Sequence, residues 1–235
     1  GQGLEQLRET IAQVAKSTPS RPRRSFSRLP LDRVFLRKGF GTVITGTFLD
    51  GPLREGDQVL LMPGEIGARV RQLQVHGRQV EEAQPGQRVA VNLAGVERRD
   101  IHRGLVLFKG EGLEAVDKIA ARFQLLPSAP PLASNTRIRF HCGSSETIGR
   151  AVVLGAASVE PGTDALVQFR LEEPVVAVRG DRYVIRSWSP ITTIGGGEII
   201  EAGRRRLSRR KETVVENLLI REEGKPAKQI GRAHV

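Results

Sequence analysis

The sequence from Leu29 onward is built of short, β-branched apolar runs separated by glycine and proline turns. Turn pairs such as Pro63-Gly64 and Pro85-Gly86 recur between the runs. Several strands at spacings of roughly 8–12 residues are typical of an antiparallel barrel or sandwich. The first set of predicted strands comprises residues 31–37, 42–48, 57–62, 68–75 and 87–93.

A second set of strands follows the glycine-rich break at residues 109–112. One barrel of about 180 residues is an alternative, but the strand number and this break favour two small domains meeting near residue 113. We therefore expect a mainly β fold of two consecutive small antiparallel β-barrels. The second set comprises residues 117–126, 136–142, 147–154, 165–172, 174–178 and 181–188, followed by Gly195-Gly196-Gly197.

Helical patterns flank the barrel region. Residues 3–16 place Leu4, Leu7, Ile11 and Val14 on one stripe, which predicts an amphipathic helix that packs on a preceding domain. Prolines then predict an extended linker over residues 17–24. From Arg204 onward, a run rich in arginine and then leucine and valine predicts a basic helix. That helix is either an RNA-contacting face or a solvated connection to a further domain.

The charge balance and the single cysteine limit the function classes. The 235 residues include 37 Lys and Arg against 26 Asp and Glu, a formal net charge of +11, which indicates contact with a polyanion. One cysteine excludes an intramolecular disulfide framework, and the scattered histidines make zinc binding unlikely on spacing grounds. No apolar run approaches the roughly 20 residues of a membrane span, and we expect a cytoplasmic protein.

Three segments carry a family resemblance. LDRVFLRKGFGTVITGTFLDGPLREGDQVLLMPG, with the following VRQLQVHGRQVEEAQPGQRVAV, resembles the second domain of translational GTPases of the elongation factor Tu type. DRYVIRSWSPITTIGGGEIIE looks like the closing strands of their third domain. The T-I-G-G-G variant and H-G-R-Q-V-E-E-A-Q are most similar to the selenocysteine-specific elongation factors.

This resemblance implies a domain order. Residues 1–20 would be the last helix of a GTP-binding domain, 21–112 the second domain, 113–203 the third, and 204–229 the helical start of a winged-helix region. Residues 230–235, IGRAHV, match the translation of a common sequencing adapter, and we interpret them as read-through. The chain has no G-x-x-x-x-G-K-[ST] loop, so we expect no nucleotide or metal cofactor within it, and whether it is an enzyme stays open. GTP and Mg²⁺ are implied for the full-length protein.

The resemblance also implies the partners. They are selenocysteinyl-tRNA, which is delivered to the ribosome at recoded UGA codons, and an mRNA hairpin bound by further C-terminal domains, with the factor acting as a monomer. A related GTPase with another cargo and a barrel scaffold that binds RNA only through its charge are the alternatives.

Four residues are candidates for holding the aminoacyl end. A selenol is an anion at neutral pH, and guanidinium groups bind it in a way that a neutral hydroxyl cannot match. Arg33 and Arg88 are the candidate donors, Asp32 would receive the amino group, and His76 lies at the same strand ends. An ordinary Asp32–Arg33 ion pair, a solvated Arg88 and a polar edge role for His76 are the structural alternatives.

Arg137, Arg139 and His141 alternate along one predicted strand and share a face, which the resemblance assigns to the tRNA arm. A solvated barrel face is the alternative. We expect Cys142 to be buried and inert, Tyr183 and Trp188 to lie in the core, and the glycines at 46 and 195–197 to mark close backbone approaches.

Overall fold

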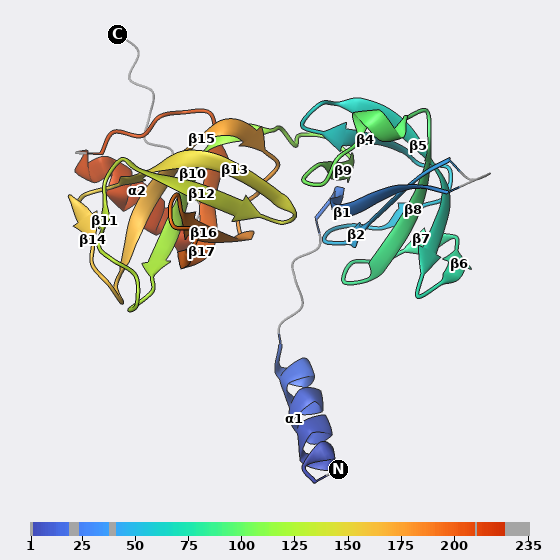
Figure 1. The fold of residues 1–235 in the computed structure, drawn as a ribbon, viewed down its shortest axis with the longest axis horizontal. Coiled ribbons are helices and arrows are strands. Elements are labelled where there is room, and N and C mark those ends of the chain that lie inside the picture. Colours follow the sequence, from blue (N-terminus) through green and yellow to red (C-terminus); the bar gives the residue numbers. More distant parts are fainter. Residues whose placement is uncertain (1, 19–23, 38–40, 210, 224–235) are drawn as a thin grey trace.

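The computed structural model describes residues 2–18, 24–37, 41–209 and 211–223. It contains two closed antiparallel barrels side by side, which confirms the predicted fold class (Figure 1). Residues 19–23 of the expected linker and the tail at 230–235 lie outside the described residues.

Barrel 1 closes through six strands in the order β4-β9-β1-β2-β8-β5, with β5 pairing back to β4. Strand β6 extends β5 as a hairpin, and β3 pairs with β7. Its core contains Phe48, Leu73 and Val91, all fully buried. The elements are β1 (Ser27–Arg37), β2 (Gly41–Thr47), β3 (Leu53–Arg54), β4 (Gln58–Met62), β5 (Ile66–Val75), β6 (Arg78–Val80), β7 (Glu82–Ala83), β8 (Arg88–Ala94), the 3-10 helix η1 (Arg98–Asp100) and β9 (Val106–Lys109).

Barrel 2 closes in the order β10-β15-β13-β12-β16-β17, and β11 pairs with β14 beside it. Phe123, Phe140, Phe169 and Tyr183 meet in its core, which confirms the predicted position of Tyr183. Residues 174–178 form no separate strand, because β15 runs on to Val175. The strands are β10 (Val116–Leu125), β11 (Leu132–Ala133), β12 (Thr136–Cys142), β13 (Ser145–Val153), β14 (Ser158–Val159), β15 (Asp164–Val175), β16 (Arg182–Ser187) and β17 (Thr193–Gly203).

The glycines predicted at close approaches are required there. A Cβ atom at Gly46 would overlap with the carbonyl oxygen of Pro30, and one at Gly197 with that of Arg122. Gly197 pairs with Phe123 on β10 and Tyr183 on β16, so it lies where β17 closes barrel 2. Small residues are therefore needed for the strands to approach.

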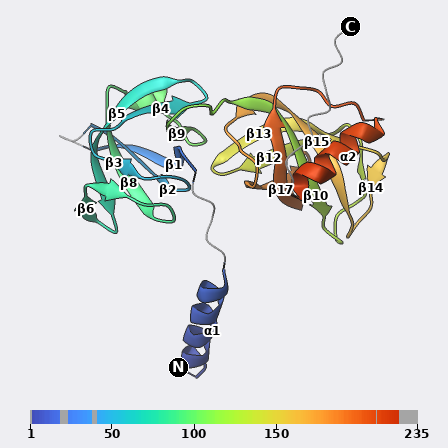
Figure 2. The same cartoon turned by 180° about the vertical axis from the view of Figure 1, so that it is seen from behind.

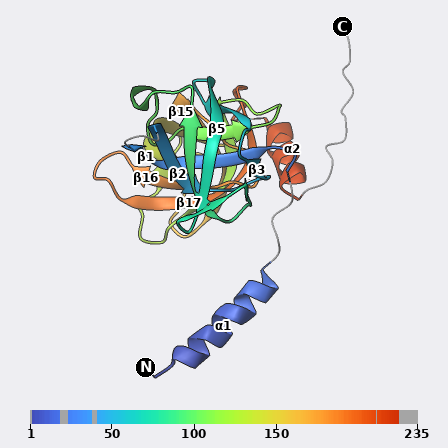
Figure 3. The ribbon, with the colours of Figure 1, turned by 90° about the vertical axis from the view of Figure 1, so that its right-hand side faces the viewer.

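Two helices flank the barrels, as predicted. Helix α1 (Leu4–Ser17) buries none of its residues and lies apart from both barrels (Figure 3). Helix α2 (Glu212–Glu222) lies across β10 and β17 (Figure 2) and buries Leu218 against Ala120, Leu166 and Ile200. Among the described residues, neither helix has the length and hydrophobicity needed to cross a bilayer.

The basic run from Arg204 was expected to be helical and is not. Helix α2 begins only at Glu212, and residues 204–209, here called the strap, form neither helix nor strand. Gln168 donates from Nε2 to the carbonyl of Arg205 (2.9 Å) and accepts from the backbone N–H of Leu207 (3.1 Å). These bonds occupy backbone groups that a helix would use internally, so they oppose helix formation in the strap.

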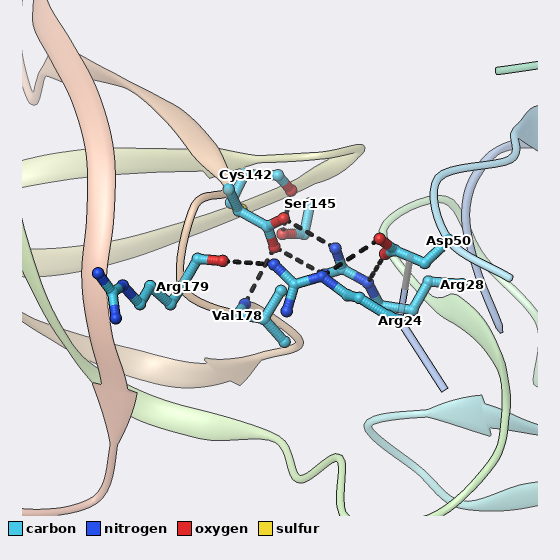
Figure 4. Close-up of polar contacts among 8 residues, drawn as sticks. Arg24, Arg28, Asp50, Cys142, Ser145, Val178 and Arg179 are labelled. Atoms are coloured by element: carbon cyan, nitrogen blue, oxygen red, sulfur yellow. Dashed lines mark hydrogen bonds and ion pairs between the residues drawn. The ribbon is translucent and has the colours of Figure 1, made fainter. Parts of the chain in front are cut away.

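A buried ionic cluster joins the two barrels (Figure 4). Arg28 of β1 bonds Asp50 within barrel 1 (2.7 Å) and both carboxylate oxygens of Asp181 in barrel 2 (2.6 and 2.8 Å). Arg24 pairs with Asp50 (3.3 Å) and donates to the carbonyl of Arg179 (2.6 Å). Burial alone would lower the pKa of Arg28, but the two carboxylates outweigh it and raise it. The cluster fixes how the barrels lie relative to each other.

An apolar cluster borders this ionic contact. Met62, Val106 and Phe108 of barrel 1 pack with Val176 of barrel 2, and Phe26 lies against Phe108 with ring centroids 5.9 Å apart. The apolar contact and the ion pairs are adjacent, since the guanidinium of Arg28 lies over the ring of Phe26, and both join barrel 1 to barrel 2.

Candidate functional site

A charged site lies on the outside of barrel 1 where β1, β2 and β8 run together. Arg88 at the start of β8 pairs with both oxygens of the Asp32 carboxylate, with Nη2 2.9 Å from Oδ1. Thr45 of β2 donates its hydroxyl to the same Oδ1 at 2.9 Å. Asp32 stands at an irregularity in the β1–β2 register, between the pairs Leu31–Gly46 and Arg33–Thr45. The ion pair that Asp32 forms is therefore with Arg88, and not with Arg33 as in the structural alternative.

The electrostatics keep this carboxylate charged. The hydrogen bond from Arg88 lowers the pKa of Asp32 most, burial opposes it, and Thr45 and the charge of Arg33 lower it further. The side chain of Arg88 remains 50% exposed and that of Arg33 is also exposed. The site thus presents a carboxylate and a guanidinium that are bound to each other, next to an exposed second guanidinium.

His76 lies at the edge of this group. It has φ 50° in the turn that joins β5 to β6, followed by Gly77 at φ 78°. Val75 pairs with Val89, so the chain enters this turn beside Arg88. The structure therefore brings Asp32 and Arg88 into direct contact. The charge of Arg33 also acts on Asp32, and the strand register places the turn that contains His76 beside Arg88. Thr45 was missed, although it is the strand partner of Arg33.

A second candidate site lies on β12 of barrel 2. Ile138, Phe140 and Cys142 point into the core, so Arg137, Arg139 and His141 share the outer face, as the alternation predicts. Arg137 pairs with Glu172 (3.2 Å) and Arg139 with Glu146 (2.8 Å).

Trp188 was expected in the core and is instead 37% exposed. It follows the last residue of β16, and its ring lies 4.1 Å from the guanidinium carbon of Arg137 and 4.7 Å from that of Arg139. Ile185 points into the core and Arg186 outward, so the same alternation, continued one residue past the end of β16, also places Trp188 outward. The expected core position was therefore wrong, and the indole instead contacts two arginines of the predicted row.

The same face contains buried donors that lack partners. Among the described residues, Nε of Arg139, Nε of Arg186 and Nε2 of His141 have no hydrogen-bond partner. Arg139 and Arg186 are opposite each other in the β12–β16 register. Burial lowers the pKa of His141; Glu146 opposes this, and Arg186, Arg139 and Arg103 lower it further. Unpaired nitrogen atoms in a cationic setting suit an anionic ligand.

Cys142 is buried beneath this face, as expected. Burial, with the nearby charge of Asp181, raises the pKa of its thiol to about 12, and the charge of Arg28 only partly offsets this. Such a thiol is no nucleophile at neutral pH. Within the described ranges, no group of three or more His, Cys, Asp or Glu side chains is placed to hold a metal ion.

The paired barrels are similar to domains of one class of protein, the translation elongation factors. The model of elongation factor Tu domain 2 matches residues 41–108, and the model of the selenocysteine-specific elongation factor β-barrel domain matches residues 119–206.

Within that class, the resemblance to the selenocysteine-specific elongation factors is confirmed. The chain is 40% identical over 210 residues to the selenocysteine-specific elongation factor of Desulfomicrobium baculatum (89% of this chain, 33% of that protein). It is 31% identical over 212 residues to that of Escherichia coli K12 (90% and 32%). It also matches the crystal structure of a bacterial selenocysteine-specific elongation factor with a TM-score of 0.77 at 28% identity, over 93% of this chain and 35% of that one. The chain thus spans about a third of the length of these curated relatives.

Proposed function

We propose that these barrels carry selenocysteinyl-tRNA for GTP-dependent delivery to the ribosome in the cytoplasm. Barrel 1 would hold the aminoacyl end through Asp32, Arg33, Arg88 and His76, and barrel 2 would contact the tRNA through Arg137, Arg139 and His141. GTP and Mg²⁺ would bind to another part of the full-length factor, and an mRNA hairpin to its C-terminal domains. The observation that carries the proposal is the Asp32 carboxylate, held by Arg88 and Thr45, beside an exposed Arg33.

The geometry supports a division of roles within barrel 1. Arg88 is already neutralised by two bonds to Asp32, so its main effect is to orient that carboxylate. The carboxylate is the group that would accept the α-amino group of the esterified residue. Arg33 has an exposed side chain one residue away and would bind the selenolate. A seryl hydroxyl would leave this cation unpaired, which disfavours the wrong cargo.

The test compares binding of selenocysteinyl-tRNA and seryl-tRNA to the full-length factor. A hydrogen bond to a charged group contributes about 1.5–3 kcal/mol, so Arg33→Gln should reduce the preference for selenocysteine about 10- to 100-fold. Arg71→Gln, at another exposed barrel 1 arginine, is the control and should keep the preference. An unchanged preference in Arg33→Gln would overturn the assignment of the selenolate to Arg33. An equal affinity of the parent protein for both tRNAs would overturn the proposal that selenocysteinyl-tRNA is the cargo.

The barrel 2 contribution has a separate readout. Each phosphate contact that is lost should reduce the slope of log K against log salt by about 1, so Arg137→Gln with Arg139→Gln should reduce it by about 2. Arg98→Gln with Arg99→Gln removes the same charge from η1 and should leave the slope unchanged. Equal slopes in the two double variants would contradict a tRNA contact at β12.

A further inference from the structure

A row of basic residues crosses four adjacent strands of barrel 2, and its member on β10 is buried at one end of the row. In the strand registers, each member faces the next one. Neighbouring strands lie about 4.8 Å apart, so the row extends about 15 Å around the barrel. This cation row comprises Lys118 of β10, Arg170 of β15, Arg150 of β13 and Arg137 of β12.

Like charges directly opposite each other destabilise a sheet, and here only the ends of the row are compensated. Lys118 pairs with Asp117, and Arg137 with Glu172. The two central members bond neutral acceptors instead. Arg150 donates to the carbonyl of Asn135 (3.0 Å) and Arg170 to that of Leu207 (3.2 Å). The centre of the row therefore keeps its positive charge.

The strap adds three more cations next to this centre. Gln168, which is fully buried, holds the strap backbone at residues 205 and 207, and Arg170 bonds it at Leu207. Leu207 packs beneath α2, while Arg204, Arg205 and Arg206 are exposed. Burial, followed by the charge of Arg206, lowers the pKa of Arg170, which places Arg206 close to the row. The strap, which is held on the barrel, thus adds positive charge to a cluster in which the cations already repel one another.

We propose that the cation row and the strap together bind the sugar-phosphate backbone of RNA. Carboxylates pair with Lys118, Arg137 and Arg204, the last with Glu114 at 3.6 Å. The remaining cations are closely spaced on a fixed sheet and the strap, which suits an evenly charged polyanion more than a single small anion. Arg137 belongs to both barrel 2 surfaces, but the remaining residues are separate from the candidate site on β12. The inference requires no particular cargo, so it stands or falls independently of the selenocysteinyl-tRNA proposal.

The experiment measures how the full 235-residue chain binds a fluorescent RNA duplex of about 20 base pairs without tRNA features, over a range of salt concentrations. Replacing Arg204, Arg205 and Arg206 together by Gln should reduce the slope of log K against log salt by about 3. The matched control replaces Arg69, Arg71 and Arg78, three exposed arginines of β5 and β6, and should change the slope by less than about 1. Equal losses in both triple variants would mean that only net charge matters and would overturn the proposal.

A second variant tests whether the strap must be held in place. Gln168→Met keeps every charge but removes both bonds to the strap backbone. We expect several-fold weaker duplex binding with an unchanged salt slope, in a protein whose circular dichroism confirms that it is folded. Unchanged affinity would overturn the inference that a fixed strap forms the surface.

Discussion

Replacing Arg28 by Met should destabilise the protein far more than replacing an exposed arginine. The side chain of Arg28 is 3% exposed, and its partners Asp50 and Asp181 are 5% and 14% exposed. Removing one member of a buried ionic cluster leaves uncompensated charge in a site that water does not reach, which costs about 3–5 kcal/mol. Arg24 remains 3.3 Å from Asp50, so Asp181 loses more than Asp50 does.

The matched control is Arg54→Met, which removes the exposed Arg54–Glu82 pair. Arg54 is 67% exposed, and such surface pairs contribute about 0–1 kcal/mol. Both variants lose one ion-paired arginine, but Arg28 is buried between two carboxylates, whereas Arg54 is exposed beside one.

The assay is urea unfolding followed by two signals. The single tryptophan, Trp188, reports on barrel 2, while far-ultraviolet circular dichroism reports on both barrels. In the parent chain we expect the two transitions to coincide. In Arg28→Met the free energy of unfolding should fall by about 3–5 kcal/mol and the two transitions should separate. A loss no larger than that of Arg54→Met, with coincident transitions, would refute the reasoning.

Three further outcomes are expected. Gly197→Ala should lower the free energy of unfolding by about 1–3 kcal/mol or more, because its Cβ would overlap with a backbone carbonyl. Gly203→Ala has open space around its Cβ and should be nearly neutral in the same urea assay. The folded-state pKa of Asp32 is lowered, so the stability that it contributes is present above the ordinary carboxyl pKa of 3.8 and is lost as the pH falls through the lower folded value. Carboxyl NMR titration should show the Asp32 pKa rising in Arg88→Gln. Cys142 should resist iodoacetamide at pH 8 until urea unfolds the chain, because burial raises the pKa of its thiol to about 12.

Local patterning predicted the strands well because their burial repeats every two residues. Residues 136–142 were predicted as a strand and form β12 with the expected face outward. The tight glycines were also predictable, since a glycine inside an apolar run marks a close approach of backbones.

Interactions between distant residues were not predictable in this way. The helix expected from Arg204 fails because a side chain 37 residues away, Gln168, binds the backbone there. Asp32 and Arg88 were both candidates, but their direct pairing depends on a strand register that joins residues 56 positions apart. Trp188 contacts Arg137 and Arg139, which belong to another strand about 50 residues earlier in the chain, so its environment could not be found from its own segment.

The contact between Arg28 and Asp181 has a consequence for synthesis, which proceeds from the N-terminus. The two residues are 153 positions apart, so at about 5–20 residues per second Arg28 waits about 8–30 s for its second partner to be made. During that time Asp50 can already neutralise it, because both belong to barrel 1. Phe26, Met62 and Phe108 stay uncovered over the same interval, because Val176 comes from barrel 2. Barrel 1 is thus synthesised with one apolar face exposed to solvent, which barrel 2 covers when it folds.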